Sequence, residues 1–195
     1  MIGRYELNEE DCILIILDIQ EKLAAAVLDK ESVIENALHL IELCKLHNIP
    51  IIVTEQYPKG IGHTVAELAQ SLAQSPAQSI EGFNSVNIVE KLTFSCCGAP
   101  SFAEQLKVID RKKVIICGIE AHICVLQTTI DLLKNGYTVH IVKDGVSSRM
   151  RENKEVALNY MQQAGAIITT TETVLFQILK KAGTDKFKII SKRVK

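Results

Sequence analysis

The sequence predicts an α/β protein, a three-layer α/β/α sandwich around a six-stranded, mostly parallel sheet of Rossmann-like topology. Two observations predict it. Short apolar runs alternate along the whole chain with segments whose apolar residues recur at helical spacing. The first run, Cys12 to Leu17, is apolar at every position, as is typical of a strand buried on both faces of a parallel sheet. With 195 residues the chain fits a single domain, 1–195.

The first half of the chain predicts three strands, at 12–17, 51–54 and 85–91. It also predicts helices over about 33–47 and near 64–73. Ser32 is the expected N-cap of the first helix, and Asn48 followed by Pro50 should end it. The second helix lies within a long polar segment, 55–85, that also holds Pro76.

The second half continues the alternation with strands at 114–117, 137–142 and 166–169. The predicted helices cover 100–109, 123–134, 152–163 and 172–181. Pro100 is favourable in the first turn of a helix, and Gly136 and Gly165 are placed to end two of the others. The basic tail, 186–195, is expected to be solvated or to contact another subunit.

Charge and composition exclude several classes of partner. The formal net charge is −1, so nothing favours nucleic acid or an anionic membrane. No apolar run approaches the ~20 residues of a membrane span. The six cysteines sit mostly in apolar or helical patterns, and the polar, acidic N-terminus does not resemble a signal peptide. We therefore expect a cytoplasmic protein with reduced cysteines.

Three reactive residues stand where predicted strands end. Asp18 closes the first strand, Lys91 closes the third, and Cys124 follows the fourth at the start of a helix. The carboxyl ends of parallel strands meet at one edge of a sheet, so these side chains should converge. A carboxylate can accept the thiol proton, and an ammonium beside it stabilises both anions. The sequence therefore predicts thiolate attack on a carbonyl, a thioester intermediate and its hydrolysis, with Asp18 as the base.

The chain resembles the isochorismatase-like cysteine hydrolases, and within them the isochorismatase domain-containing branch. Three motifs carry the resemblance: Leu17-Asp-Ile-Gln20, the Lys91 segment with Phe94-Ser-Cys96, and Gly118-Ile-Glu-Ala-His-Ile-Cys-Val125. The branch is further indicated by Thr54-Glu-Gln-Tyr-Pro-Lys-Gly60 and Asp144-Gly-Val-Ser-Ser-Arg149. The resemblance runs from about Asn8 to Lys195.

The resemblance implies roles at matching positions. Asp18, Lys91 and Cys124 match the catalytic triad of the family. A cis peptide bond is implied between Ile119 and Glu120, and the backbone N–H groups of Glu120 and Cys124 would form the oxyanion hole. Many members carry Thr where this chain has Ala121. Five residues at strand ends or in nearby loops are candidates for substrate binding: Gln20, Gln56, Tyr57, Phe94 and His122.

Where nicotinamidases carry metal-binding histidines, this chain has Thr54-Glu-Gln-Tyr57, and His63 is the only imidazole of that segment. We therefore expect no catalytic metal and no cofactor, and a substrate other than nicotinamide. The expected partners are a small amide or related acyl compound and further copies of the chain. Val174, Leu175, Ile178 and Leu179, which lie at helical spacing, are the candidate subunit contact.

Two expectations concern charge and alternative functions. Lys91 and a helix N-terminus favour a thiolate, so we expect the pKa of Cys124 to lie below the ~8.5 of a free thiol, with Asp18 titrating as part of the same unit. The alternatives to a hydrolase are an interaction protein on the same fold with little turnover, and a thiol redox sensor centred on Cys124. Asp144 with Ser147, Ser148 and Arg149 is expected to supply a helix cap and a local ion pair in preference to a substrate contact.

Overall fold

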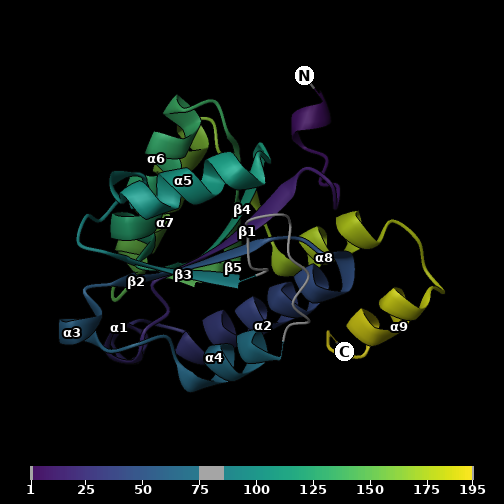
Figure 1. Cartoon of the computed structure of the whole chain (residues 1–195), viewed down its shortest axis with the longest axis horizontal. Coiled ribbons are helices and arrows are strands. Elements are labelled where there is room, and N and C mark those ends of the chain that lie inside the picture. The colour runs from purple at the N-terminus through teal and green to yellow at the C-terminus, as the bar shows by residue number, and fades with distance from the viewer. Residues whose placement is uncertain (1, 75–85, 195) are drawn as a thin grey trace.

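The sheet is six-stranded and parallel throughout, with the order β3-β2-β1-β4-β5-β6 (Figure 1). The computed structural model describes residues 2–74 and 86–194. The strands are β1 (Cys12–Leu17), β2 (Ile51–Gln56), β3 (Val86–Lys91), β4 (Lys113–Ile119), β5 (Thr138–Ser147) and β6 (Ile167–Thr169). The all-apolar run forms β1 in the middle of the sheet, and every one of its residues is buried. The predicted fold class is confirmed.

Helices cover both faces of the sheet, as Figure 1 shows. On one face lie α2 (Lys30–His47), α4 (Ala66–Ala73), α8 (Thr171–Leu179) and α9 (Asp185–Ser191). On the other lie α5 (Pro100–Ile109), α6 (Leu126–Lys134) and α7 (Arg151–Gln163). Two short helices, α1 (Glu21–Ala26) and α3 (Pro58–Ile61), follow β1 and β2. Alternate residues of β1 enter opposite clusters, Leu14 and Ile16 on one side and Ile13 and Ile15 on the other. The apolar core thus has two halves, separated by the sheet.

The start of one helix differs from the prediction for a local reason. The expected cap Ser32 lies inside α2, which begins at Lys30 after Asp29 in a left-handed conformation (φ 52°). The chain therefore enters the helix earlier, and Ser32 instead accepts a hydrogen bond from the Asn36 side chain. At the other end, Asn48 is the C-cap, as predicted. Ser85, the expected first residue of β3, and 75–84 lie outside the described residues.

The C-terminal region packs more tightly than its charge indicates. The first half of the basic tail lies in α9 (Asp185–Ser191), and Ile190 is fully buried against the chain's own core, whereas a tail that is solvated or contacts another subunit was expected. The four apolar residues of α8 offered as a subunit contact are also buried in the chain's own core: Val174, Leu175, Ile178 and Leu179. That prediction is wrong, because α8 packs on the sheet between α2 and α9. These four residues therefore belong to the core and are not available to contact another subunit.

No helix within residues 2–74 and 86–194 combines the length and the apolar character that crossing a membrane requires.

Candidate active site

Asp18 and Lys91 meet at the carboxyl edge of the sheet, as their positions at strand ends predict. Lys91 Nζ donates to Asp18 Oδ2 at 2.8 Å, and both side chains are fully buried. The second carboxylate oxygen, Oδ1, accepts from Thr54 Oγ1 at 2.6 Å. Asp18 itself has a left-handed backbone (φ 52°), a conformation that aspartate tolerates better than most residues. Both oxygens of Asp18 are therefore held in fixed directions.

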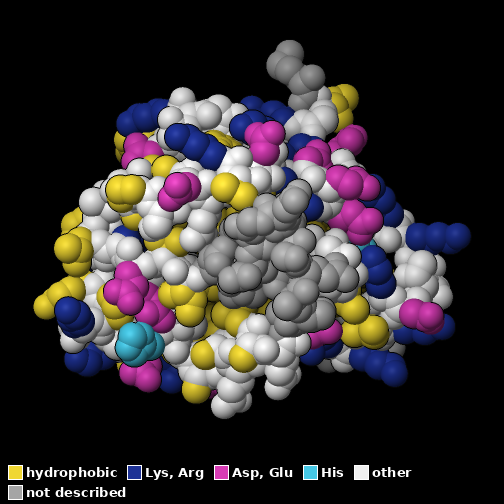
Figure 2. Space-filling model, in the orientation of Figure 1, with side chains coloured by type: hydrophobic (Ala, Val, Ile, Leu, Met, Phe, Trp, Pro, Cys, Tyr) yellow, Lys and Arg dark blue, Asp and Glu magenta, His cyan; other side chains and the backbone are white. Residues whose placement is uncertain are grey.

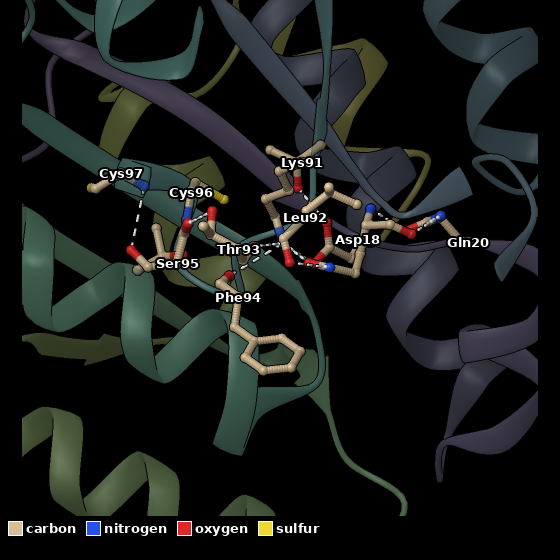
Figure 3. A network of polar contacts seen from close by, with 12 residues as sticks. Asp18, Gln20, Lys91, Leu92, Thr93, Phe94, Ser95, Cys96 and Cys97 are labelled. Atoms are coloured by element: carbon tan, nitrogen blue, oxygen red, sulfur yellow. Dashed lines mark hydrogen bonds and ion pairs between the residues drawn. The ribbon is translucent and has the colours of Figure 1, made fainter. Parts of the chain in front are cut away.

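Lys91 is surrounded by acceptors (Figure 3). Besides Asp18, its ammonium donates to Gln56 Oε1 at 2.7 Å and to the backbone oxygens of Thr93 and Phe94 at 3.3 and 3.2 Å. Burial is the largest single influence and disfavours the ammonium, but the charge of Asp18, together with Cys96, Cys124 and the hydrogen bond to Asp18, outweighs it and raises the pKa of Lys91. Lys91 is therefore a fixed cation at this edge of the sheet, held by its own neighbours.

Cys124 lies beside this pair. It belongs to a π-helical turn, Ala121–Val125, that leads into α6, and it is 5% exposed. Irregular turns of this kind recur at functional sites. Burial, followed by the charge of Asp18 and a hydrogen bond with its carboxylate, raises the pKa of Cys124, while Lys91 acts in the opposite direction. The expected low pKa is therefore wrong for the free site, because burial and the charge of Asp18 outweigh the charge of Lys91. The Cys124 side chain is therefore a thiol with the Asp18 carboxylate near it.

Gly118 lets β4 approach β1 at the point where both strands enter the site. It pairs with Leu17, the residue before Asp18, and its φ is 135°. A Cβ atom at this position would lie 2.1 Å from the Leu17 carbonyl oxygen. Only glycine therefore fits, and its absence of a side chain sets the spacing between the Asp18 and Cys124 segments.

The turn between Gly118 and Cys124 contains the cis peptide bond that the family resemblance implies. The peptide bond between Ile119 and Glu120 is cis. The Glu120 carbonyl accepts the N–H groups of Ile123 and Val125. The buried Glu120 carboxylate accepts from Arg149 N at 2.9 Å and from Arg149 Nε at 3.1 Å. Arg149 therefore pairs with a residue of a distant segment, and the expected local ion pair is wrong. Asp144 Oδ1 accepts Thr171 N at the start of α8, although the N-cap of that helix is Thr170.

Two of the residues offered for substrate binding have structural partners instead. Gln20 is fully buried, and its amide donates to the Gln56 and Gly62 carbonyls and accepts from Gln56 N. Its functional groups are therefore used up in joining the ends of β1 and β2. Gln56 is buried as well, and its amide bridges Lys91 Nζ and the Leu92 carbonyl. We reassign both glutamines to positioning of Asp18 and Lys91.

The other three candidates differ in exposure. Tyr57 and Phe94 are half exposed at the same edge of the sheet, and the Phe94 ring points away from the Asp18–Lys91 network (Figure 3). Tyr57 also lines a cavity of about 390 Å³ with Glu90 and Leu92. His122 is half-buried, and its Nδ1 lies 3.0 Å from Ser148 Oγ. Tyr57 and Phe94 remain available to a ligand, whereas His122 is tied to the end of β5.

The segment after β2 holds an acid–imidazole pair. Glu55 is buried and accepts from Thr64 N, Thr64 Oγ1 and His63 Nδ1 at 2.7, 2.7 and 2.9 Å. Burial opposes ionisation, but these hydrogen bonds prevail and lower the pKa of Glu55. Within the described ranges, no cluster of three or more His, Cys, Asp or Glu side chains is placed to hold a metal ion. The pair therefore fixes the loop after β2 to the sheet.

Thr54 and Glu120 are the site residues whose side-chain roles the sequence alone did not predict. Thr54 pairs with Leu17 in the sheet, so a polar residue at the end of a buried strand was the available signal. For Glu120 the signal was an acidic residue inside an otherwise apolar turn. Neither side-chain role can be predicted from the local sequence, because the partners, Asp18 and Arg149, are distant in sequence.

Comparison with known proteins identifies relatives over the whole chain. The model of the isochorismatase domain matches residues 12–173. Isochorismatase family protein 1A of Dictyostelium discoideum is 41% identical over 94% of this chain and 86% of its own length. Isochorismatase domain-containing protein 2 of Danio rerio is 38% identical over 98% of this chain and 91% of its own length.

Solved structures agree with the fold. A protein described as MAR1 ribonuclease from Caenorhabditis elegans superposes with a TM-score of 0.86 at 40% identity, covering 97% of this chain and 92% of that one. The Escherichia coli YcaC product, described as an octameric hydrolase of unknown specificity, superposes with a TM-score of 0.85. It covers 96% of this chain and 90% of that one, and at 22% identity it shows likeness of fold alone.

Proposed function

Because the chain belongs to the isochorismatase family, we propose that it is a cysteine hydrolase that cleaves a small amide or related acyl compound through a thioester on Cys124. One observation carries the proposal: the buried Asp18 carboxylate pairs with the Lys91 ammonium at 2.8 Å and lies near enough to Cys124 for its charge to raise the pKa of that thiol. A nucleophile, a base and a fixed cation thus share one edge of the sheet.

The order of proton transfers follows from the raised pKa of Cys124. Asp18 removes the thiol proton as sulfur attacks the carbonyl carbon, so the thiolate forms only during attack. Lys91, already 2.8 Å from Asp18, offsets the negative charge that the pair shares. The tetrahedral intermediate then collapses, and Asp18 returns the proton to the leaving nitrogen. A sulfur–carbon bond has replaced the carbon–nitrogen bond.

Hydrolysis of the thioester completes the cycle. Water attacks the same carbonyl with Asp18 as base, the carbon–sulfur bond breaks, and the proton returns to Cys124. The oxyanion formed in both halves would be stabilised by the N–H groups of Glu120 and Cys124. Among the backbone hydrogen bonds that the described turns and loops make, none is donated by Glu120 N, which supports this role.

A second candidate activity comes from the Caenorhabditis relative described as a ribonuclease. Two properties favour a small acyl substrate instead. The triad residues are at most 5% exposed, so an extended polymer would meet the rim before it met Cys124. The net charge is −1, and on the face shown in Figure 2 Lys and Arg are interspersed with Asp and Glu. Nucleic-acid binding proteins usually concentrate positive charge.

The experiment compares the wild-type protein with Cys124→Ala on a panel of small aliphatic and aromatic amides and on a single-stranded RNA. We expect amide turnover that Cys124→Ala abolishes, and no RNA cleavage above that of the variant. RNA cleavage that depends on Cys124 would replace this proposal with the nuclease. Turnover of neither substrate class would favour the interaction protein, and a protein whose only Cys124-dependent response is to peroxide would be a redox sensor.

We also propose a homo-oligomer in the cytoplasm. The described octamer of the Escherichia coli relative supports assembly, and Leu92 and Phe94 expose large apolar side chains beside the site. All six cysteines are free thiols, as a reducing compartment favours. A monomeric mass by light scattering at micromolar concentration would contradict the first proposal. Labelled protein in an organelle or outside the cell would contradict the second.

A further inference from the structure

Arg149 and Glu120 join the turn before Cys124 to the end of β5. Glu120 belongs to the turn between β4 and Cys124, and Arg149 follows the end of β5. The Arg149 N–H and Nε both donate to the Glu120 carboxylate. A third contact runs in parallel, because His122 Nδ1 lies 3.0 Å from Ser148 Oγ. The turn is therefore fastened to residues 148–149 on both sides of Ala121.

The segment that holds the turn is itself anchored. Ser147 and Ser148 are fully buried. Ser147 Oγ donates to the Leu28 carbonyl at 2.6 Å, and Leu28 N donates to the Ser148 carbonyl at 3.2 Å. These bonds tie the end of β5 to the loop between α1 and α2. Arg149 thus extends from a rigid base toward the turn.

The negative charge of the Glu120 carboxylate also needs a nearby cation to offset it. Its carboxylate is 5% exposed and belongs to the residue whose N–H is the proposed oxyanion donor. A buried negative charge so near a developing oxyanion opposes it unless a cation offsets the charge. Arg149 supplies that cation at 3.1 Å. The guanidinium therefore holds the turn and removes an electrostatic penalty.

We propose that Arg149 is a positioning residue that acts through Glu120 on the oxyanion-binding turn. The inference rests on the proposed function, since it assumes acyl transfer to Cys124. It predicts a specific chemical signature. Acylation of Cys124 passes through an oxyanion, whereas alkylation by displacement at a saturated carbon does not. Loss of Arg149 should therefore slow acylation and leave alkylation of the same sulfur unchanged.

The experiment measures two rates on each full-length variant: acylation by p-nitrophenyl acetate, from the first turnover of p-nitrophenolate, and alkylation of Cys124 by iodoacetamide. Arg149→Ala should lose at least about tenfold in acylation, less than the ~10²–10³ of removing an oxyanion donor outright, with alkylation unchanged. Arg151→Ala, in the exposed first turn of α7, is the matched control and should change neither rate.

A double variant separates charge from shape. Glu120→Gln removes the carboxylate charge and keeps the side-chain size, so it should be milder than Arg149→Ala. The Glu120→Gln/Arg149→Ala protein should recover toward Glu120→Gln alone, because no unpaired carboxylate remains. If Arg149→Ala does not fold, Arg149→Lys replaces it, with the charge retained, the forked geometry lost and an intermediate acylation rate expected.

The outcomes distinguish failure of the positioning role from failure of the proposed function. Equal losses of acylation and alkylation, or a double variant no better than Arg149→Ala, would overturn the positioning role. Acylation that survives in Cys124→Ala would instead reject the proposed function itself, whatever the Arg149 variants do.

Discussion

Lys91 Nζ lies 2.8 Å from Asp18 Oδ2, and neither side chain is exposed to solvent. A buried pair of this kind adds little net stability, because desolvating two charges offsets their attraction. Removing one partner is a different matter, since the other charge then stays buried and unpaired. The pair is therefore best understood through the chemistry it supports beside Cys124.

Asp18→Asn should nearly abolish turnover and also destabilise the fold. The amide keeps the shape but cannot accept the thiol proton, and it leaves Lys91 buried without a counter-charge. Breaking a buried pair costs about 3–5 kcal/mol in the free energy of unfolding, which urea denaturation would measure. Asp18→Asn/Lys91→Met should regain stability and stay inactive. Renewed turnover in that double variant would show that the pair is structural only.

Thr54→Val should slow the reaction without removing it. The substitution preserves shape but leaves Asp18 Oδ1 without its donor at 2.6 Å. A buried acceptor left unsatisfied costs about 1–3 kcal/mol of stability, and the base loses one of its two orienting contacts. Thr54→Ser keeps the hydroxyl and is the control. Steady-state kinetics and thermal unfolding would compare the two variants. Equal turnover and equal unfolding temperatures of Thr54→Val and Thr54→Ser would rule out an orienting role for the Thr54 hydroxyl.

The pH dependence of Cys124 alkylation should reflect its raised pKa. Because burial and the charge of Asp18 favour the thiol, the rate should keep rising above the ~8.5 of a free thiol. Asp18→Asn removes a negative charge, so its profile should shift to lower pH, whereas Lys91→Ala should shift it upward. The modified peptide is quantified by mass spectrometry. A wild-type plateau near neutral pH would instead indicate a preformed thiolate.

Gly118→Ala should disrupt both the fold and the site. The new Cβ would lie 2.1 Å from the Leu17 oxygen, so β4 must move away from β1 and from Asp18. Gly136→Ala is a matched control, because Gly136 also has positive φ but has open space around it. Both variants carry the backbone cost of about 1 kcal/mol or more, and only Gly118→Ala adds the clash. Equal unfolding midpoints would contradict the steric account.

The sequence was sufficient to predict the sheet and the convergence of Asp18 and Lys91, because apolar runs mark buried parallel strands and their ends share one edge. It could not predict the bulge in β5, where the register passes from Ile116–Ile141 to Gly118–Val146. Nor could it predict that Lys91 is surrounded by acceptors from Asp18 and Gln56 as well as from its own loop. Both depend on contacts between segments distant in sequence. The raised pKa of Cys124 depends on its burial and on the nearby charge of Asp18, which the local sequence does not reveal.

The acyl-enzyme itself gives the most direct test of the central claim. The wild-type protein is mixed with p-nitrophenyl acetate, quenched in acid during the first turnover, and its intact mass and modified peptide are determined. The account predicts one acetyl group on Cys124, lost again on further incubation, and none in Cys124→Ala. Catalysed release of p-nitrophenolate with no acetyl group on Cys124, or equal release by Cys124→Ala, would contradict a covalent mechanism.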